Sequence, residues 1–402
     1  MKKRNRNIFS LILLILFFPD LSAAYDINDD IQIHGFLSQG YLDSSGNNFL
    51  ADSKGGTCQF NEIGVNLNGR INHKLRYGAQ ILSRSLGDYG DNRIRLDWGL
   101  VDFHSQDWAG IRLGKVKIPI GFYNTERDSD FLRPMIFLPQ SIYDETRRDN
   151  WLSHWGGEIY GSLATESIGD FDYQLFYGRV EYDDDSVLHD ATLTNINSRL
   201  ASIGNPLFPS AIDRFNRKND NLYGFSLIYA PPVENLRLGF SFIRQEDAFS
   251  KSGLALGSYR TNSNFVLSLE YILQNFTICA EYGENDRTQT LLDSTTFDGP
   301  NQSWYVMLTY ALTDKLSFSV LYDEYYRDKH DKKSSSHLSG RANPTPWRKD
   351  WGFGVRYDFN ENWTMKGEWH TVDGAALLQD FFNSEGVARY WQYGALKISF
   401  NF

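Results

Sequence analysis

The chain has 402 residues, a formal net charge of −10 and a mean hydropathy of −0.44. The acidic balance argues against a nucleic-acid partner, and after residue 24 no apolar stretch approaches the roughly 20 residues that a membrane-spanning helix needs. Aromatic residues nevertheless make up 15% of the chain, which is high for a polar soluble domain. A transmembrane β-barrel reconciles these facts, because its strands alternate between lipid and a wet lumen while aromatic residues gather at the membrane interfaces.

The N-terminus has the pattern of a secretory signal peptide. Four basic residues precede a short apolar run, and small residues up to Ala24 suit cleavage before Tyr25. The alternative, an uncleaved anchor, is disfavoured because the apolar run closes so early. The sequence therefore predicts a signal peptide over residues 1–24, an exported barrel domain over residues 25–402, and a bacterial outer-membrane location.

Sixteen segments of alternating polarity follow, separated by turn signals. Short connections alternate with long polar ones, which is typical of outer-membrane barrels and has no reason to occur in a soluble sandwich. The even number places both chain ends on the periplasmic side. The pattern predicts an all-β, 16-stranded antiparallel transmembrane barrel. The candidate strands are 31–43, 58–70, 74–86, 92–105, 108–120, 153–165, 170–182, 220–230, 235–247, 260–273, 275–287, 301–312, 315–327, 348–359, 362–372 and 387–402.

The third and fourth candidate strands show the two faces clearly, since successive side chains of a strand point to opposite sides. In the fourth strand, we expect the lipid-facing residues to be Ile94, Leu96, Trp98 and Leu100. The opposite, lumen-facing positions of these two strands carry Arg76, Arg84, Arg93 and Arg95. Together these arginines predict a basic patch on the inner wall.

One connection breaks the pattern of the rest. It follows the strand 108–120, runs over about residues 121–152, and has its own apolar centre. Long connections of this kind are commonly functional. On the preceding strand Lys115 and Lys117 share one face, which we expect to point into the lumen, while Val116, Ile118 and Ile120 share the other. The sequence predicts that this connection folds inward and narrows the lumen.

The predicted inward connection is rich in opposed charges. Its basic residues are Arg127, Arg133, Arg147 and Arg148, and its acidic residues are Glu126, Asp128, Asp130, Asp144, Glu145 and Asp149. Opposed charges across a narrow opening select among hydrated ions. The alternative is that they pair with one another and pin the connection to the wall. The candidate pore-lining residues are Arg76, Arg84, Arg93, Arg95, Lys115, Lys117, Arg127, Asp128, Asp130, Arg133, Asp144, Glu145, Arg147 and Arg148.

The stretches "RLGKVKIPIGFYNTERD" and "FLPQSIYDETRRD" resemble the constriction region of the Gram-negative outer-membrane porin superfamily. The likeness is greatest to the phosphate-selective and other anion-type porins, whose pattern Gly114, Lys115, Lys117, Pro119 and Gly121 match. The resemblance implies a homotrimeric passive diffusion channel for small hydrophilic solutes or inorganic ions, with an anion preference as one expectation. It also implies contact with outer-membrane lipid, lipopolysaccharide and the barrel-assembly machinery.

The last predicted strand alternates up to the chain end at Phe402. A barrel closes by pairing its last strand with its first, so the chain can end inside the wall with no edge left open. This ending resembles the C-terminal signature that outer-membrane assembly machinery reads in bacterial barrel proteins, which makes Phe402 the candidate assembly residue.

Enzyme and metal functions find no support in the sequence. No nucleophile elbow, HExxH motif or phosphate-binding loop occurs, and the acidic run at residues 181–186 lacks the spacing of a calcium loop. We therefore expect no enzymatic activity, cofactor or metal. Cys58 and Cys279 are expected to be free thiols, with a disulfide as the alternative. The rival function is a non-conducting adhesin or structural barrel whose own loops fill the lumen.

Overall fold

The structure is a computed structural model that describes residues 25–402, apart from residues 29, 51, 88, 166, 185, 206, 209, 333–344, 380 and 381. The predicted signal peptide lies outside the described residues. Among the described residues, no helix combines the length and the apolar character that crossing a membrane requires.

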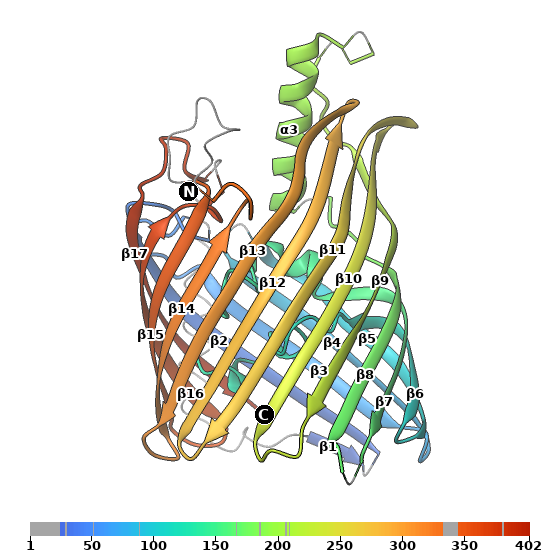
Figure 1. The fold of residues 1–402 in the computed structure, drawn as a ribbon, viewed down its shortest axis with the longest axis vertical. Coiled ribbons are helices and arrows are strands. Elements are labelled where there is room, and N and C mark those ends of the chain that lie inside the picture. Colours follow the sequence, from blue (N-terminus) through green and yellow to red (C-terminus); the bar gives the residue numbers. More distant parts are fainter. Residues whose placement is uncertain are drawn as a thin grey trace.

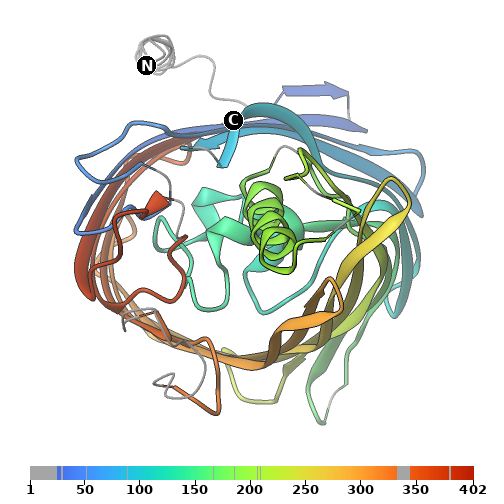
Figure 2. The same ribbon diagram turned by 90° about the horizontal axis from the view of Figure 1, so that it is seen from above.

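Sixteen antiparallel strands close into a barrel (Figures 1 and 2), which confirms the predicted fold class. Each strand pairs with its neighbours in the chain, and β17 pairs with β2 to close the ring. The strands are β2 (Ile31–Ser45), β3 (Phe60–Arg70), β4 (Leu75–Leu86), β5 (Tyr89–Gln106), β6 (Ala109–Lys117), β7 (Ser153–Leu163), β8 (Asp170–Arg179), β9 (Asn216–Ala230), β10 (Leu236–Lys251), β11 (Leu254–Leu273), β12 (Phe276–Leu291), β13 (Ser294–Ala311), β14 (Leu316–Tyr326), β15 (Trp347–Asp358), β16 (Trp363–Gly374) and β17 (Tyr390–Asn401). A short strand, β1 (Tyr25–Asn28), pairs with the start of β2.

The chain end lies within this closure. Backbone N–H groups of Gly35 and Phe402 each donate to the other residue's carbonyl oxygen, at 3.1 and 3.0 Å. Alternation along β17 leaves Leu396 half exposed on the outer face and buries Lys397 on the inner face. The last strand therefore needs no capping segment, because its edge is already paired.

The two ends of the barrel differ in their connections. Seven short turns join strands at one end, where Figure 1 also places the C-terminus. The long connections lie at the opposite end, and we call the two ends the turn end and the loop end. The hairpins β10–β11 and β12–β13 extend far beyond the other strands at the loop end (Figure 1).

These extended hairpins correct the sequence prediction. It placed the loop-end limits of the four strands at residues 247, 260, 287 and 301. The ladder instead continues to Lys251↔Leu254 and Leu291↔Ser294. Helix α3 (Val187–Ile203), which the sequence prediction did not include, packs Ile196 and Leu200 in one apolar cluster with Phe249, Leu256 and Leu291 from the inner faces of the hairpins. Burial of these side chains supports both the helix and the extra strand length.

The sequence prediction also misplaced part of β5 and the end of β6. A β-bulge between Leu96 and Trp98 shifts the register, since Ile81 pairs with Leu96 and Gln80 with Trp98. Trp98 consequently faces inward, against the predicted lipid-facing position. Strand β6 ends at Lys117 instead of residue 120.

Candidate functional site

Residues 118–152, here called the inner segment, leave the wall after β6 and return to it at β7. Figure 2 shows this segment inside the ring of strands. It contains three 3₁₀ turns, η2 (Asn124–Glu126), η3 (Asp130–Leu132) and η4 (Glu145–Arg147), and the short helix α2 (Arg148–Trp151). Its two ends are held together, because the Asn124 amide donates to the Trp151 carbonyl at 2.8 Å.

Hydrogen bonds or ion pairs join the inner segment to side chains of nine strands. These strands are β4, β5, β6, β10, β12, β14, β15, β16 and β17. The contacts come from both sides of the barrel, so the segment is braced across the lumen instead of lying along one wall. Buried carboxylates form three of the anchors, one at Asp130, one at Glu281 and one at Glu368 together with Asp323.

The first anchor is Asp130, which lies among three cations, two from the wall and one, Arg133, from the segment itself. Its carboxylate is 2.9 Å from Arg133 and 3.3 Å from both Lys366 and Lys397, and it accepts a hydrogen bond from Ser399 Oγ at 2.5 Å. Burial would raise the pKa of the Asp130 carboxyl, but the three cations and the serine hold it well below its usual range. The carboxylate therefore stays charged and ties the segment to β16 and β17.

The second anchor, Glu281 of β12, has no cation beside it among the described residues. Its carboxylate accepts hydrogen bonds from the Phe122 backbone N–H at 2.8 Å, from the Tyr143 hydroxyl at 2.6 Å, from the Tyr305 hydroxyl at 2.9 Å and from the Ser268 hydroxyl at 2.6 Å. Burial and the neighbouring Glu281 raise the pKa of the Tyr143 hydroxyl well above its usual range, so it remains a donor. At Glu281 four neutral donors satisfy the buried carboxylate, whereas at Asp130 three cations surround it.

The third anchor joins the segment's middle to the wall through backbone groups. The Glu368 carboxylate accepts from the N–H groups of Ile136 and Phe137 at 2.9 and 3.3 Å. The Asp323 carboxylate accepts from the Ser141 N–H at 3.2 Å and pairs with Arg348 at 2.7 Å. Backbone groups that the strands cannot pair are thereby satisfied inside the barrel.

Charged groups of the segment also meet the wall at β4–β6. Glu145 bridges Arg84 at 3.1 Å and Arg127 at 2.9 Å, and these cations lower the pKa of the Glu145 carboxyl against the effect of burial. Lys117 Nζ lies 2.6 Å from Asp128, and Arg148 pairs with Asp97 at 3.4 Å. The Gln80 amide donates to both Asp128 and Asp97, which links the two pairs.

The candidate residues thus fall into several groups. The first brings together Arg84, Arg127 and Glu145, and near it lie the pairs Lys117–Asp128, Asp130–Arg133 and Asp144–Arg147. Arg93 and Arg95 instead pair with Asp183, from the connection between β8 and α3. Arg76 lies apart at the turn end, 2.8 Å from Asp102.

The two lysines of the predicted motif do not act as a pair. Lys115 Nζ donates to the Leu96 carbonyl at 2.6 Å, whereas Lys117 binds Asp128. Because β6 ends early, Ile118 and Ile120 are not part of the wall. They pack in an apolar cluster with inward-facing side chains that include Phe176.

The sequence reasoning missed most of the wall residues that hold the segment. These are Gln80, Asp97, Glu281, Asp323, Arg348, Lys366, Glu368 and Lys397. Their only sequence signal is a position on the polar face of a strand. That position shows that a side chain faces inward without showing what it meets.

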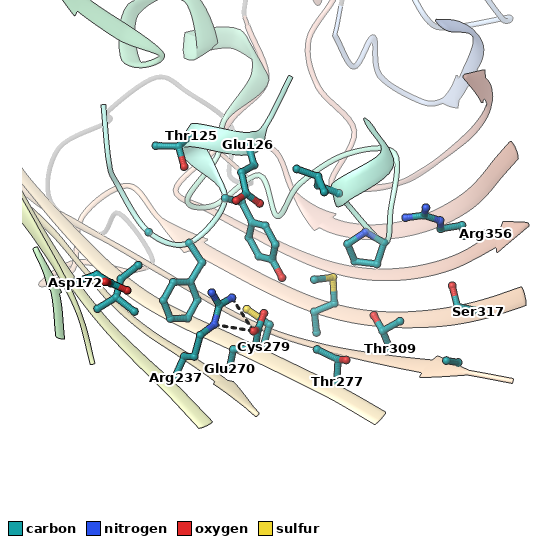
Figure 3. Close-up of a pocket in the computed structure, with 18 of the residues that line it drawn as sticks. Thr125, Glu126, Asp172, Arg237, Glu270, Thr277, Cys279, Thr309, Ser317 and Arg356 are labelled. Carbon is teal, nitrogen blue, oxygen red and sulfur yellow. Dashed lines mark hydrogen bonds and ion pairs between the residues drawn. The ribbon is translucent and has the colours of Figure 1, made fainter. Parts of the chain in front are cut away.

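Two polar cavities flank the inner segment. The larger, about 920 Å³, is open toward the turn end and is lined by Phe122, Tyr123 and Glu126 of the segment. Its wall carries the Arg237–Glu270 ion pair and the hydroxyls of Thr277, Thr309 and Ser317 (Figure 3). The smaller, about 390 Å³, lies toward the loop end and is lined by Arg93, Arg95, Lys115, Arg148 and several acids. No group of three or more metal-ligating side chains occurs in the part of the chain that the structure describes.

Comparison with known proteins places this architecture in a family. Residues 11–377 match the family model described as Gram-negative porin. No curated protein matches the chain in sequence.

Solved structures share the fold at low sequence identity. The outer membrane protein OmpT of Vibrio cholerae is 14% identical, with 95% of this chain and 100% of that chain covered and a TM-score of 0.56. The anion-selective porin from Comamonas acidovorans is 12% identical, with 92% and 99% covered and a TM-score of 0.55. Salmonella typhi OmpF, in complex with daunomycin, is 16% identical, with 94% and 100% covered and a TM-score of 0.55.

Proposed function

Because the chain belongs to the Gram-negative porin family, we propose that it is a diffusion channel of the bacterial outer membrane for small hydrophilic solutes or ions. The observation that carries this proposal is the arrangement of two polar cavities on either side of a charged segment inside a closed barrel. A solute that crosses the barrel passes from one cavity to the other beside the inner segment.

The narrowest part of this route is proposed to lie where the segment meets β4–β6. There the ion pairs Lys117–Asp128 and Arg148–Asp97 border the route, so each pair presents a positive and a negative end to a passing solute. Such charges act strongly within the Debye length of about 8 Å at physiological salt. They would orient dipolar solutes and favour hydrated ions of one sign.

We propose a modest anion preference. Arg84, Arg93, Arg95, Lys115 and Arg148 line the loop-end cavity against Asp97, Asp149, Glu181 and Asp183, which leaves five basic groups against four acidic ones. The porin from Comamonas acidovorans that shares this fold is anion-selective, which is consistent with this sign.

Export, assembly and oligomeric state complete the proposal. Residues 1–24 would serve as the cleaved signal peptide, and the paired end at Phe402 would be read by the assembly machinery. A homotrimer is proposed because one similar structure, an OmpT of Vibrio cholerae with a TM-score of 0.54, is described as a trimer form.

Planar-bilayer recording tests the channel. Purified protein should give stable stepwise openings, and reversal potentials in a salt gradient should show a modest preference for anions. Replacing both lysines, Lys115→Glu with Lys117→Glu, should move selectivity toward cations. Unchanged reversal potentials would remove these lysines from the selectivity account.

A second candidate function is favoured by one observation, the anchoring of the inner segment to nine strands. A segment braced so widely suits a closed, structural or adhesive barrel as well as a rigid constriction. Correctly folded protein that stays electrically silent would support this second function and reject the first.

A further inference from the structure

Several cations on the outer face of the barrel, here called the outer cation patch, differ from the rest because they have no carboxylate partner. The patch consists of Lys115 of β6, Arg179 of β8 and Arg244 of β10. No carboxylate oxygen of the described residues lies within 4.0 Å of their charged nitrogens. Other outward-facing cations of the strands do have such a partner, in the pairs Lys218–Asp220, Arg260–Glu246 and Lys349–Glu324.

Strand register places Lys115 and Arg179 in one row, on either side of Trp155. Trp155 of β7 pairs with Lys115 and with Arg179. Directly opposed residues of antiparallel strands share a face. Trp155 is 45% exposed on the outer face, whereas its neighbour His154 is buried on the inner face against Phe176. Because adjacent strands lie about 4.8 Å apart, the two cations flank the indole with a backbone separation of about 10 Å.

The outer face changes in character from this row toward the turn end. The next outward row pairs Tyr177, Tyr223 and Arg244 across β8, β9 and β10. The row after it is apolar and consists of Ile159, Leu175, Phe225 and Phe242. Toward the loop end the surface therefore passes from apolar through aromatic to cationic side chains. This order is typical of the boundary between lipid chains and lipid headgroups.

Both cations beside Trp155 have hydrogen-bond donors to spare. The Lys115 ammonium donates to the Leu96 carbonyl at 2.6 Å, so two of its three hydrogens remain. The Arg179 side chain is exposed and donates to no other group of the described residues. Strand β8 ends at Arg179, and Lys115 also borders the loop-end cavity. These donors therefore lie at the loop-end edge of the wall.

Acidic groups beside the patch are already engaged. The Glu181 carboxylate, two residues after Arg179, accepts from the Trp155 indole N–H at 2.9 Å. Glu246 of β10 pairs with Arg260. The patch therefore keeps a net positive charge next to an apolar surface. An anion that carries hydrocarbon chains complements both features.

We propose that the outer cation patch binds the phosphate headgroup of an anionic lipid in the leaflet at the loop end. Lys115 and Arg179 donate charge-assisted hydrogen bonds to the phosphate oxygens. The Trp155 ring packs against the lipid between them, Arg244 adds positive potential, and the acyl chains lie on the apolar row. The inference rests on the membrane location in the proposed function and does not depend on conduction.

Lipid binding to the purified protein in an uncharged maltoside detergent tests the site. Phosphatidic acid and phosphatidylcholine with identical chains are titrated separately, and bound lipid is counted by native mass spectrometry. The wild type should bind phosphatidic acid saturably and about tenfold more tightly than phosphatidylcholine, because two charge-assisted contacts favour the anion. The double variant Lys115→Gln with Arg179→Gln should weaken the binding of phosphatidic acid by about tenfold or more.

The matched control is Arg260→Gln with Lys349→Gln, which removes two outward cations that already have carboxylate partners. Its affinity for phosphatidic acid should equal that of the wild type. Arg179→Gln alone decides the question if the double variant does not fold, and it should weaken binding about three- to tenfold.

Three outcomes would overturn the site. They are equal affinity for phosphatidic acid in the wild type and the double variant, equal binding of the two lipids by the wild type, and complete displacement of the lipid by excess inorganic phosphate. The last result would show an ion site without a role for the acyl chains. Since the measurement needs no current, a protein that binds phosphatidic acid but stays electrically silent would reject the channel and retain the lipid site.

Discussion

Two of the carboxylate anchors of the inner segment, Asp130 and Glu281, hold it through different interactions. At Asp130 three cations surround one carboxylate, whereas at Glu281 four neutral donors do so. Ion pairs leave a buried charge behind when one partner is lost, while neutral donors lose only hydrogen bonds. Both carboxylates are fully paired, yet losing a partner should cost more free energy at Asp130 than at Glu281.

The largest expected effect is at the cation-rich anchor. Asp130→Ala leaves Arg133, Lys366 and Lys397 without their shared carboxylate, although Lys397 keeps Glu62 at 2.6 Å. We expect a loss of about 3–5 kcal/mol from the free energy that holds the segment in place. Backbone hydrogen exchange over residues 128–138 should rise accordingly in detergent micelles.

The control for this variant is Asp107→Asn, whose side chain is 97% exposed at the turn end. It should leave exchange over the same residues unchanged. Equal protection in Asp130→Ala and the wild type would show that the ion cluster does not hold the segment.

A smaller effect is expected at the neutral anchor. Glu281→Gln keeps one acceptor oxygen. Its new amide NH₂ group can donate to the neighbouring hydroxyl oxygens, which can rotate to accept. We expect a loss of about 1–3 kcal/mol, because no cation is left unpaired. Hydrogen exchange at Phe122 reports it, and a loss larger than that of Asp130→Ala would reverse the comparison.

Tyr143→Phe should have a smaller effect again. It removes the 2.6 Å hydrogen bond to Glu281 and the acceptor of the Tyr123 N–H at 3.1 Å, and it leaves the other three donors to Glu281 in place. A loss of about 1 kcal/mol is expected. The double variant with Glu281→Gln should show less than the sum of the two losses, and full additivity would mean that the two groups do not interact.

The least change is expected from mild acid at the Asp130 anchor. Its pKa is lower in the folded protein than in the unfolded chain, so its stabilisation is present above the unfolded value of about 3.9. It is lost only as the pH falls through the folded value. Between pH 7 and pH 5 the titration of Asp130 should therefore not change the protection of residues 128–138 from hydrogen exchange. A loss of protection in that window that depends on Asp130 would contradict the lowered pKa.

The sequence predicted the wall better than the segment inside it. Alternation along a strand is a local property, so Leu396 and Lys397 could be assigned to opposite faces without the structure. The bulge at Asp97 is different, because one extra residue reverses the faces beyond it and carries Trp98 inward. The turn Leu292–Asp293 was also missed, since its two positive φ angles, 49° and 61°, fall on residues that rarely signal a hairpin.

The site was predicted only in outline. The inner segment and its charges could be located because a long apolar and charged connection interrupts the strand pattern. Its partners could not, because Asp130 meets Lys366 and Lys397 across more than 230 residues of chain. Pairing at that separation depends on how the barrel closes, and strand polarity carries no information about it.

The central claim is that the inner segment narrows a conducting lumen, and single-channel conductance tests it most directly. The wild type is compared with a variant in which a short Gly-Ser linker replaces residues 125–148. Such a linker can join the remaining ends because Asn124 contacts Trp151 at 2.8 Å. The account predicts stepwise openings in the wild type and a several-fold larger conductance in the variant. Equal conductance in the two proteins would contradict it.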